Sequence, residues 1–421
     1  MNAPRWLTAL MLAAIGGCDT GPAQAPATAP VRSVFFGDLR LPGDQLDDPT
    51  TRRQRRLDFA AVTGPASARP GGTWEAARAA AERAYEPGAF TTFAAVDYLP
   101  DVDAKTAMRT VILRGAEQAG TPPGEPQPRG PAALWAWMDE LRDLGIETLA
   151  VAQPAAEPAL PALPADAFVA NAAEQRARNE PLAAMVHAED QPAIDSALGY
   201  GITLESRGGS NPFQFGLVAG GAHVNGAAGL TGVWATANTR EAIYAALRRR
   251  ETFATGGQRI ALQLVAGAAV GDEAPAGSAA GITMGGDLLP AMQEPQFFAR
   301  AVADPDGAPL QRLQMIKGWV AGGTTHQQVY DIACADGANP DSAAGRCPDG
   351  AAAPCDPGAA AGTSRLEATW QDPAFPTDQE AYYYLRVLAG AGCEATPQAW
   401  SSPIWYHGGA REAPAPEPVP R

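Results

Sequence analysis

The chain is short of histidine, because its 421 residues include only His187, His223, His326 and His407. A metal centre built on several imidazoles would need most of them in one place. The four are widely scattered in the sequence, so the composition argues against such a centre.

The chain also lacks an excess of positive charge. Its 31 Lys and Arg residues are outnumbered by 46 Asp and Glu residues, giving a formal net charge of -15. We therefore expect no nucleic-acid partner and no binding to an anionic membrane surface. Hydrophobic residues make up 46% of the chain, which is enough for the packed core of one large domain or two ordinary ones.

The N-terminus has no apolar run long enough to cross a membrane. Arg5 and the short apolar stretch from 6 to 15 are typical of an export signal, and Ile15-Gly16-Gly17-Cys18 resembles a bacterial lipobox. We expect residues 1–18 to be a signal peptide and Cys18 to carry a lipid. The protein would then be a periplasmic lipoprotein held on the membrane through Cys18 alone; the alternative is a secretory signal with a chance cysteine.

Cysteine is otherwise confined to the C-terminal third, at Cys334, Cys347, Cys355 and Cys393. In an exported protein these four predict two disulfides. Of the three possible connectivities, we favour Cys334–Cys347 with Cys355–Cys393 because sequential pairing closes the shortest loops. A zinc site is the alternative, although the spacings lack a Cys-x-x-Cys pair.

The order of apolar segments predicts an α/β protein in the first part of the chain. Short strands alternate with helices, which implies mainly parallel pairing in a barrel or an open sheet. The last helix of this part is expected at 239–250, with Asn238 or Thr239 as its N-cap. The strands of this part are expected at 34–39, 57–63, 90–98, 109–114, 148–151 and 215–219. Its other helices are expected at 74–85, 132–144, 166–178 and 193–205.

After residue 258 the pattern changes to strands separated by Gly, Pro and Asp, which predicts a β-rich part. The expected organisation is a Pro/Ala tether at 19–32, an α/β part at 33–258, a β-rich part at 259–408 and a disordered Pro-rich tail at 409–421.

A basic cluster, Arg52-Arg53-Gln54-Arg55-Arg56, lies between the first two expected strands. It could bind an anion, but three aspartates between residues 47 and 58 largely offset its charge. We interpret it as a solvated loop.

Several long segments resemble a known family when taken together and in order. They are Arg176–Leu182, Asn211–Leu217, Leu230–Ala235, Asn238–Ile243, Leu247–Thr255, Lys317–Trp319, Val329–Cys334 and Trp400–Tyr406. The chain is similar over residues 33–407 to the exported family called domain of unknown function 3604, which resembles the polymerase-and-histidinol-phosphatase (PHP) metallohydrolases. The resemblance implies a distorted PHP-like (β/α) barrel with a β-rich C-terminal appendage.

Members of that superfamily carry metal ligands at the strand ends of the barrel mouth, where the metals activate water for phosphoester hydrolysis. The matching positions here have almost all lost their ligands, so the resemblance implies a lost metal site and no cofactor. The His-x-His falls on Arg40 and Pro42, the Thr-Asp-His on Thr63, Gly64 and Pro65, and the acidic residue on Asp97. A further histidine falls on Met108, the Pro-His-Asn on Ala152, Gln153 and Pro154, and the late ligand motif on 221–225, with Ala222 and Val224 in ligand places and His223 one place out of register.

Some metal-binding capacity remains in the sequence. Asp38, Asp97 and His223 are weak candidate ligands for a divalent ion such as Mn²⁺, Zn²⁺ or Mg²⁺. His187 is interpreted as a surface residue, and His326 and His407 as structural residues of the β-rich part. No nucleophile motif is present, so we assign no catalytic residue.

Three functions follow from these observations. The favoured one is a non-catalytic, PHP-like envelope lipoprotein that serves as a scaffold or binds a small molecule or a protein. The alternatives are a divergent phosphoesterase-like hydrolase using Asp38, Asp97 and His223, and an interaction module in the β-rich part. Under the favoured interpretation Arg40 is a fixed positive charge where a metal would lie, and it pairs with Asp97 or holds an anion.

Overall fold

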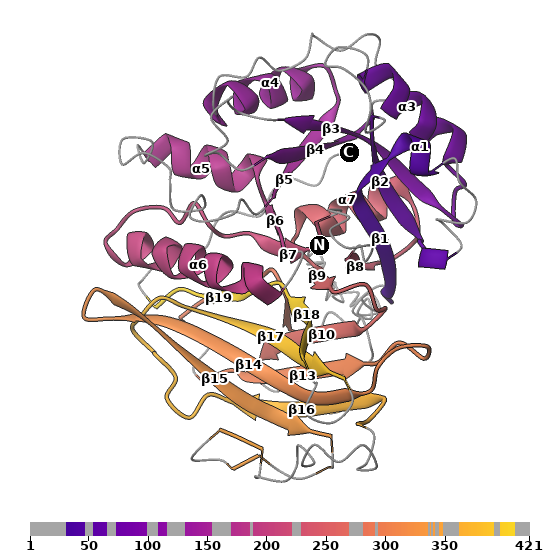
Figure 1. Cartoon of the computed structure of the whole chain (residues 1–421). Helices are drawn as coiled ribbons and strands as arrows, with labels where there is room; N and C mark the ends of the chain where they lie inside the picture. Colours follow the sequence, from indigo (N-terminus) through magenta and orange to yellow (C-terminus); the bar gives the residue numbers. More distant parts are fainter. Residues whose placement is uncertain are drawn as a thin grey trace, which may run out of the picture.

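The structure is a computed structural model of mixed α/β architecture, with an α/β part above a β-rich part in the view of Figure 1. Among the residues it describes, no helix is long and apolar enough to cross a membrane. Cys18 and the expected signal, most of the tether, and the tail lie outside the described residues. Those described are 31–46, 54–64, 73–98, 108–115, 131–153, 170–185, 188–220, 229–268, 281–290, 294–335, 337, 340–341, 345–347, 362–390 and 396–408.

Within the described residues, the α/β part has nine strands that follow the order β9-β8-β1-β2-β3-β4-β5-β6-β7 in space. Their side chains are buried on both faces of the sheet, which explains the nearly continuous apolar runs in the sequence. The strands are β1 (Ser33–Pro42), β2 (Phe59–Thr63), β3 (Thr91–Tyr98), β4 (Arg109–Arg114), β5 (Glu147–Ala152), β6 (Leu182–Ala184), β7 (Gly216–Val218), β8 (Leu230–Ala235) and β9 (Thr252–Thr255).

The two ends of this sheet are joined through hydroxyl groups. Thr252 Oγ1 of β9 donates a hydrogen bond to the carbonyl of Leu217 in β7 at 2.9 Å, and Ser402 Oγ accepts one from the Leu217 amide at 2.8 Å. Next to them, the amide of Ala219 donates to Thr231 Oγ1 of β8 at 3.0 Å. These contacts draw β7 onto β8 and β9, so the sheet closes into a distorted barrel.

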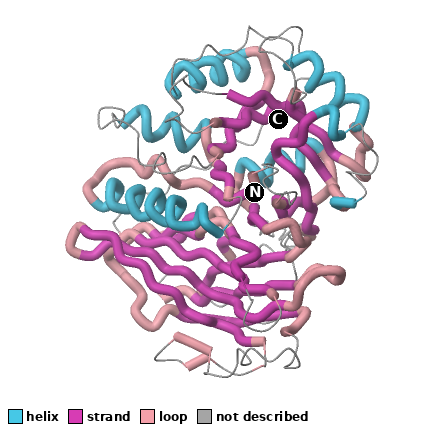
Figure 2. The backbone as a smooth tube through the Cα atoms, in the orientation of Figure 1, coloured by secondary structure: helices cyan, strands magenta, loops and turns pink. Residues whose placement is uncertain are grey.

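Most of the helices cover the outer side of these strands, whereas the helix at 191–206 packs on the β-rich part (Figure 2). Thr239 is the N-cap of α7, because its hydroxyl accepts a hydrogen bond from the Ala242 amide at 3.3 Å. Asn238, the other cap candidate, instead donates to the carbonyls of Asp58 and Ala89. The helices are α1 (Gly43–Leu46), α3 (Thr73–Ala84), α4 (Pro131–Asp143), α5 (Ala170–Asn179), α6 (Gln191–Ser206) and α7 (Arg240–Arg248), with a short 3₁₀ turn at Ala188–Asp190.

The β-rich part continues the barrel sheet, because β18 pairs antiparallel with β9. A second sheet, in the order β11-β10-β13-β16, packs on it through aromatic side chains such as Phe297 and Tyr383, whose ring centroids are 4.7 Å apart. The strands are β10 (Ala261–Gly267), β11 (Ile282–Thr283), β12 (Asp287–Leu288), β13 (Gln296–Val302), β14 (Leu310–Ala321), β15 (Thr324–Cys334), β16 (Arg365–Gln371), β17 (Ala381–Ala389), β18 (Thr396–Ser401) and β19 (Ile404–Tyr406).

The predicted α/β class with a β-rich C-terminal part is confirmed, but the expectation of mainly parallel pairing is wrong in part. β4 runs antiparallel to both β3 and β5, and β8 runs antiparallel to both β1 and β9. Only residues 99–108 separate β3 from β4, which is too short for a parallel crossover of about a dozen or more residues. One reversed strand, β4, therefore accounts for two of the antiparallel pairs.

The predicted disulfide between Cys334 and Cys347 is present, with an S–S distance of 2.01 Å. It ties the end of β15 to the segment that follows it. The second predicted pair, Cys355 with Cys393, lies outside the described residues, as does His187.

Candidate functional site

Of the predicted ligand positions, Arg40, Asp97, Met108 and Gln153 lie together at strand ends, and we call this group, with Thr110, the barrel mouth. Arg40 follows the buried part of β1, and its Nε donates to Asp97 Oδ2 at the end of β3, at 2.9 Å. Thr110 of β4 is the cross-strand neighbour of Asp97 and donates to its Oδ1 at 2.8 Å. Gln153 reaches the Thr110 hydroxyl at 3.4 Å, and its backbone amide donates to the carbonyl of Met108 at 2.9 Å.

Asp38 lies one alternation before Arg40 on β1, and its side chain is completely buried. Arg55 donates to Asp38 Oδ2 at 2.5 Å, and the backbone amide of Arg40 donates to Oδ1 at 2.8 Å. Both carboxylate oxygens therefore have charged or polar donors. Asp38 is held in a structural ion pair.

The interpretation of the basic cluster as a solvated loop is wrong for Arg55 and incomplete for Arg56. Arg55 is largely buried against Asp38, and Arg56 donates to both carboxylate oxygens of Asp304 at 2.6 Å. The interpretation considered only the aspartates close to the cluster in sequence, whereas the partner of Arg56 lies 248 residues away.

The remaining positions of the predicted ligand set offer no metal donor where the structure describes them. Pro42 pairs with Thr63 in the β1–β2 ladder, and Gly64 follows directly, so neither supplies a side-chain ligand. Pro65, Ala222, His223 and Val224 lie outside the described residues. Among the described side chains, Asp38 and Asp97 belong to no group of three His, Cys, Asp or Glu residues close enough to share an ion.

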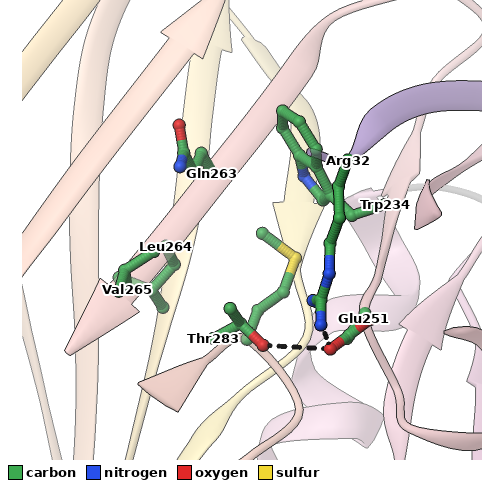
Figure 3. Close-up of a pocket in the computed structure, with 8 residues that line it drawn as sticks. Arg32, Trp234, Glu251, Gln263, Leu264, Val265 and Thr283 are labelled. Atoms are coloured by element: carbon green, nitrogen blue, oxygen red, sulfur yellow. Dashed lines mark hydrogen bonds and ion pairs between the residues drawn. The ribbon is translucent and has the colours of Figure 1, made fainter. Parts of the chain in front are cut away.

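A small cavity lies near the start of β1, between β8, β10 and β11 (Figure 3). Arg32 lines it beside the indole of Trp234 and donates to Glu251 Oε1 at 2.5 Å. Its volume of about 20 Å³ has room for about one water molecule. The cavity is therefore no substrate pocket.

A second polar group lies where α6 meets the β-rich part, and we call it the His407 cluster: the buried Glu205, Glu380 and His407, and the partly exposed Asp287. The imidazole Nδ1 lies 2.9 Å from Glu205 Oε1 and 3.4 Å from Glu380 Oε2, and Nε2 lies 3.1 Å from Asp287 Oδ1. Among the described residues, Glu205, Glu380 and His407 form the one group of this kind that could share an ion.

Backbone geometry brings the cluster together. The β17–β19 ladder pairs Ala381 with Tyr406, so the next residues, Glu380 and His407, stand opposite each other just beyond its end. Gly408 then passes so close to the chain that a Cβ there would lie 2.2 Å from the Gln379 nitrogen. Glu205 comes from the last turn of α6, and Asn211 Nδ2 holds its other oxygen at 3.4 Å.

The carboxylates have a strong effect on His407. Burial lowers the pKa of the imidazole, but its interactions with the carboxylates of Asp287, Glu205 and Glu380 outweigh this and raise the pKa to about 11. An open cavity of about 520 Å³ adjoins Glu205 and Glu380, between the turn after α6 and the β14–β15 turn. The expectation that His407 is a plain structural residue did not anticipate this cluster. No sequence motif joins its members, of which Glu205 and His407 are 202 residues apart.

The fold and the barrel mouth define a mixed α/β protein with a β-rich second part and an ion-paired strand edge. The family model described as "Protein of unknown function (DUF3604)" matches residues 45–191 and 220–398, more than half of the chain. The chain therefore belongs to the DUF3604 family.

Other comparisons add little to this assignment. No curated protein matches the chain. A solved structure from Bacteroides vulgatus ATCC 8482, described as a two-domain protein containing a predicted PHP-like metal-dependent phosphoesterase, is similar over 90% of this chain and 100% of its own. The sequence identity is 9% and the TM-score is 0.38, so this likeness carries no argument about chemistry.

Proposed function

We propose that this protein is a non-hydrolytic member of its family, in which the barrel is a scaffold for the β-rich part. The observation that carries the proposal is the pairing of two carboxylates, Asp97 in the mouth and Asp38 beneath it, with guanidinium groups. Arg40 forms an ion pair with Asp97, and Arg55 forms one with Asp38. A guanidinium stays charged at any physiological pH, so these carboxylates are neutralised without a metal.

The mouth also lacks the means to activate water. A hydrolytic metal needs several ligands that hold it and leave an open position for water. Here the described positions supply arginine, proline, glycine, methionine and glutamine in place of ligands. A metal ion placed beside Asp97 would also be repelled by the Arg40 guanidinium.

We expect no phosphoesterase activity from the purified protein. Phosphomonoester and phosphodiester substrates, supplied with Mn²⁺, Zn²⁺ or Mg²⁺, are expected to turn over at the background rate, with no difference between the wild type and Asp97→Asn. Turnover above background that Asp97→Asn abolishes, while Glu147→Gln retains it, would support the divergent hydrolase instead.

We further propose that the protein is exported and anchored by a lipid on Cys18. The Cys334–Cys347 disulfide supports an oxidising compartment, and the lipobox-like sequence supports the anchor. Replacing Cys18 with Ala is expected to move the protein from the membrane fraction to the soluble fraction after cell fractionation. Cys18→Ala protein that stays with the membrane would refute the lipid anchor.

A further inference from the structure

We propose that the His407 cluster is a binding site for one divalent transition metal ion, with Zn²⁺ as the first candidate. The ligands would be His407 Nδ1 and one carboxylate oxygen each from Glu205 and Glu380. This site is separate from the barrel mouth and goes beyond the non-hydrolytic scaffold function proposed above.

The first argument is an unsatisfied oxygen. Glu380 is buried, with 8% of its surface exposed, and its Oε2 has no hydrogen-bond partner among the described residues. Leaving a buried carboxylate oxygen without a donor is costly. The nearest candidate is His407 Nδ1 at 3.4 Å, but that nitrogen carries at most one proton, which is directed by the shorter 2.9 Å contact toward Glu205. A cation among the three groups would satisfy both carboxylates.

The second argument is the spacing of the donor atoms. Two ligands that each lie about 2.1 Å from a zinc ion are about 3.4 Å apart at a tetrahedral angle and about 3.0 Å apart at a right angle. The two carboxylate oxygens lie 2.9 and 3.4 Å from Nδ1, and all three donor atoms lie within 4.8 Å of one another. The spacings from Nδ1 to the two carboxylate oxygens therefore fit an ion that His407 shares with Glu205 and Glu380.

The third argument is the orientation of the imidazole. A histidine that binds a metal through one nitrogen usually donates the other N–H to a carboxylate. Asp287 Oδ1 lies 3.1 Å from Nε2, and Asp287 is itself held by Arg250 at 3.4 Å. A metal ion that replaces the Nδ1 proton would lie between Nδ1 and the carboxylates of Glu205 and Glu380, while Nε2 keeps its proton for Asp287.

The donor set and the surroundings indicate the kind of ion. One imidazole with two carboxylates suits Zn²⁺ or Mn²⁺, whereas Ca²⁺ and Mg²⁺ prefer oxygen ligands alone. The adjoining cavity of about 520 Å³ leaves room for water as a further ligand. Because Glu205 belongs to α6 and the other two ligands to the β-rich part, a bound ion would join these two parts of the fold (Figure 1).

Zinc binding by the chelator-treated full chain tests the proposal. We expect titration calorimetry to show one Zn²⁺ per chain and a higher melting temperature with Zn²⁺ present. Glu380→Gln, which keeps the side-chain size, should abolish this binding, and Asp287→Asn should weaken it by about 10- to 100-fold. Asp97→Asn at the barrel mouth is the control and should bind like the wild type. Wild-type protein that binds no Zn²⁺, or Glu380→Gln that binds as tightly as the wild type, would overturn the proposal.

X-ray absorption at the zinc edge keeps the test independent of the variants' folding. The wild type is expected to show nitrogen and oxygen donors with one imidazole and no sulfur. Sulfur donors would assign the zinc to cysteines instead, and a first shell without imidazole would equally contradict binding by His407.

Discussion

Replacing Glu180 with Gln is expected to lower the free energy of unfolding by about 3–5 kcal/mol, because it removes one charge from a buried ion-pair group. Glu180 has 1% of its side chain exposed, and it accepts hydrogen bonds from Arg109 at 3.2 and 3.3 Å and from the Trp135 indole at 3.0 Å. Arg176 Nε lies 3.3 Å from it, one helical turn away. The neutral amide of the variant would take the carboxylate charge away from two buried guanidinium groups.

Chemical denaturation near pH 7 measures this effect, with Glu147→Gln as the matched control. Glu147 also pairs with an arginine, at 2.5 Å, but half of its side chain is exposed, so its replacement should cost less than about 1 kcal/mol. Equal losses in the two variants would show that the buried group contributes no more than a surface pair.

The same glutamate gives the stability a defined dependence on pH. Burial raises the pKa of Glu180, but the charges of Arg109 and Arg176 more than offset burial and hold the pKa below its ordinary value. A carboxyl with a lowered folded-state pKa stabilises the fold above its unfolded pKa, and this contribution disappears as the pH falls through the folded pKa. The gap in stability between wild type and Glu180→Gln should therefore narrow in acid; a gap that widens would contradict this sign.

Asp38→Asn is expected to lower the free energy of unfolding by about 3 kcal/mol, since it removes the charge that faces Arg55 beneath the barrel mouth. The Asp38 side chain is fully buried and that of Arg55 is 17% exposed. Water therefore solvates the Arg55 charge poorly once the Asp38 charge is gone. A double-mutant cycle with Arg55→Met measures the coupling between the two side chains directly.

Asp97→Asn is the matched control for Asp38→Asn, because Asp97 also pairs with an arginine but is 27% exposed. Its loss should be about 1 kcal/mol or less. If Asp38 were a metal ligand, Asp38→Asn would release a bound metal and show no coupling to Arg55→Met.

The sequence predicts much of the fold because strand and helix signals are local. Apolar runs such as those of β2 and β3 and the cap at Thr239 depend on residues close in the chain, and they are recovered within a few positions. The direction of β4 is different, because it depends on how the chain turns between residues 98 and 109. Strand pairing across the barrel depends on distant segments, such as β1 with β8, which no local pattern reveals.

The candidate sites show the same difference between local signals, which the sequence reveals, and contacts between distant segments, which it does not. Pairing of Arg40 with Asp97 is one of two roles that the sequence resemblance implies for Arg40, and the structure has that pair. The Arg55–Asp38 pair was missed because the charges near Arg55 in sequence are not its partners in space. The His407 cluster was missed because its four members are separated by long stretches and meet only through the β17–β19 register and the end of α6.

The most direct test of the central claim is a metal titration of the Glu380→Gln variant, in which the barrel mouth is intact and the His407 cluster is disabled. If the mouth has lost its metal chemistry, this variant binds no stoichiometric Mn²⁺, Zn²⁺ or Mg²⁺. Stoichiometric binding by Glu380→Gln that disappears when Asp97→Asn is added would contradict the account and place a metal at the mouth.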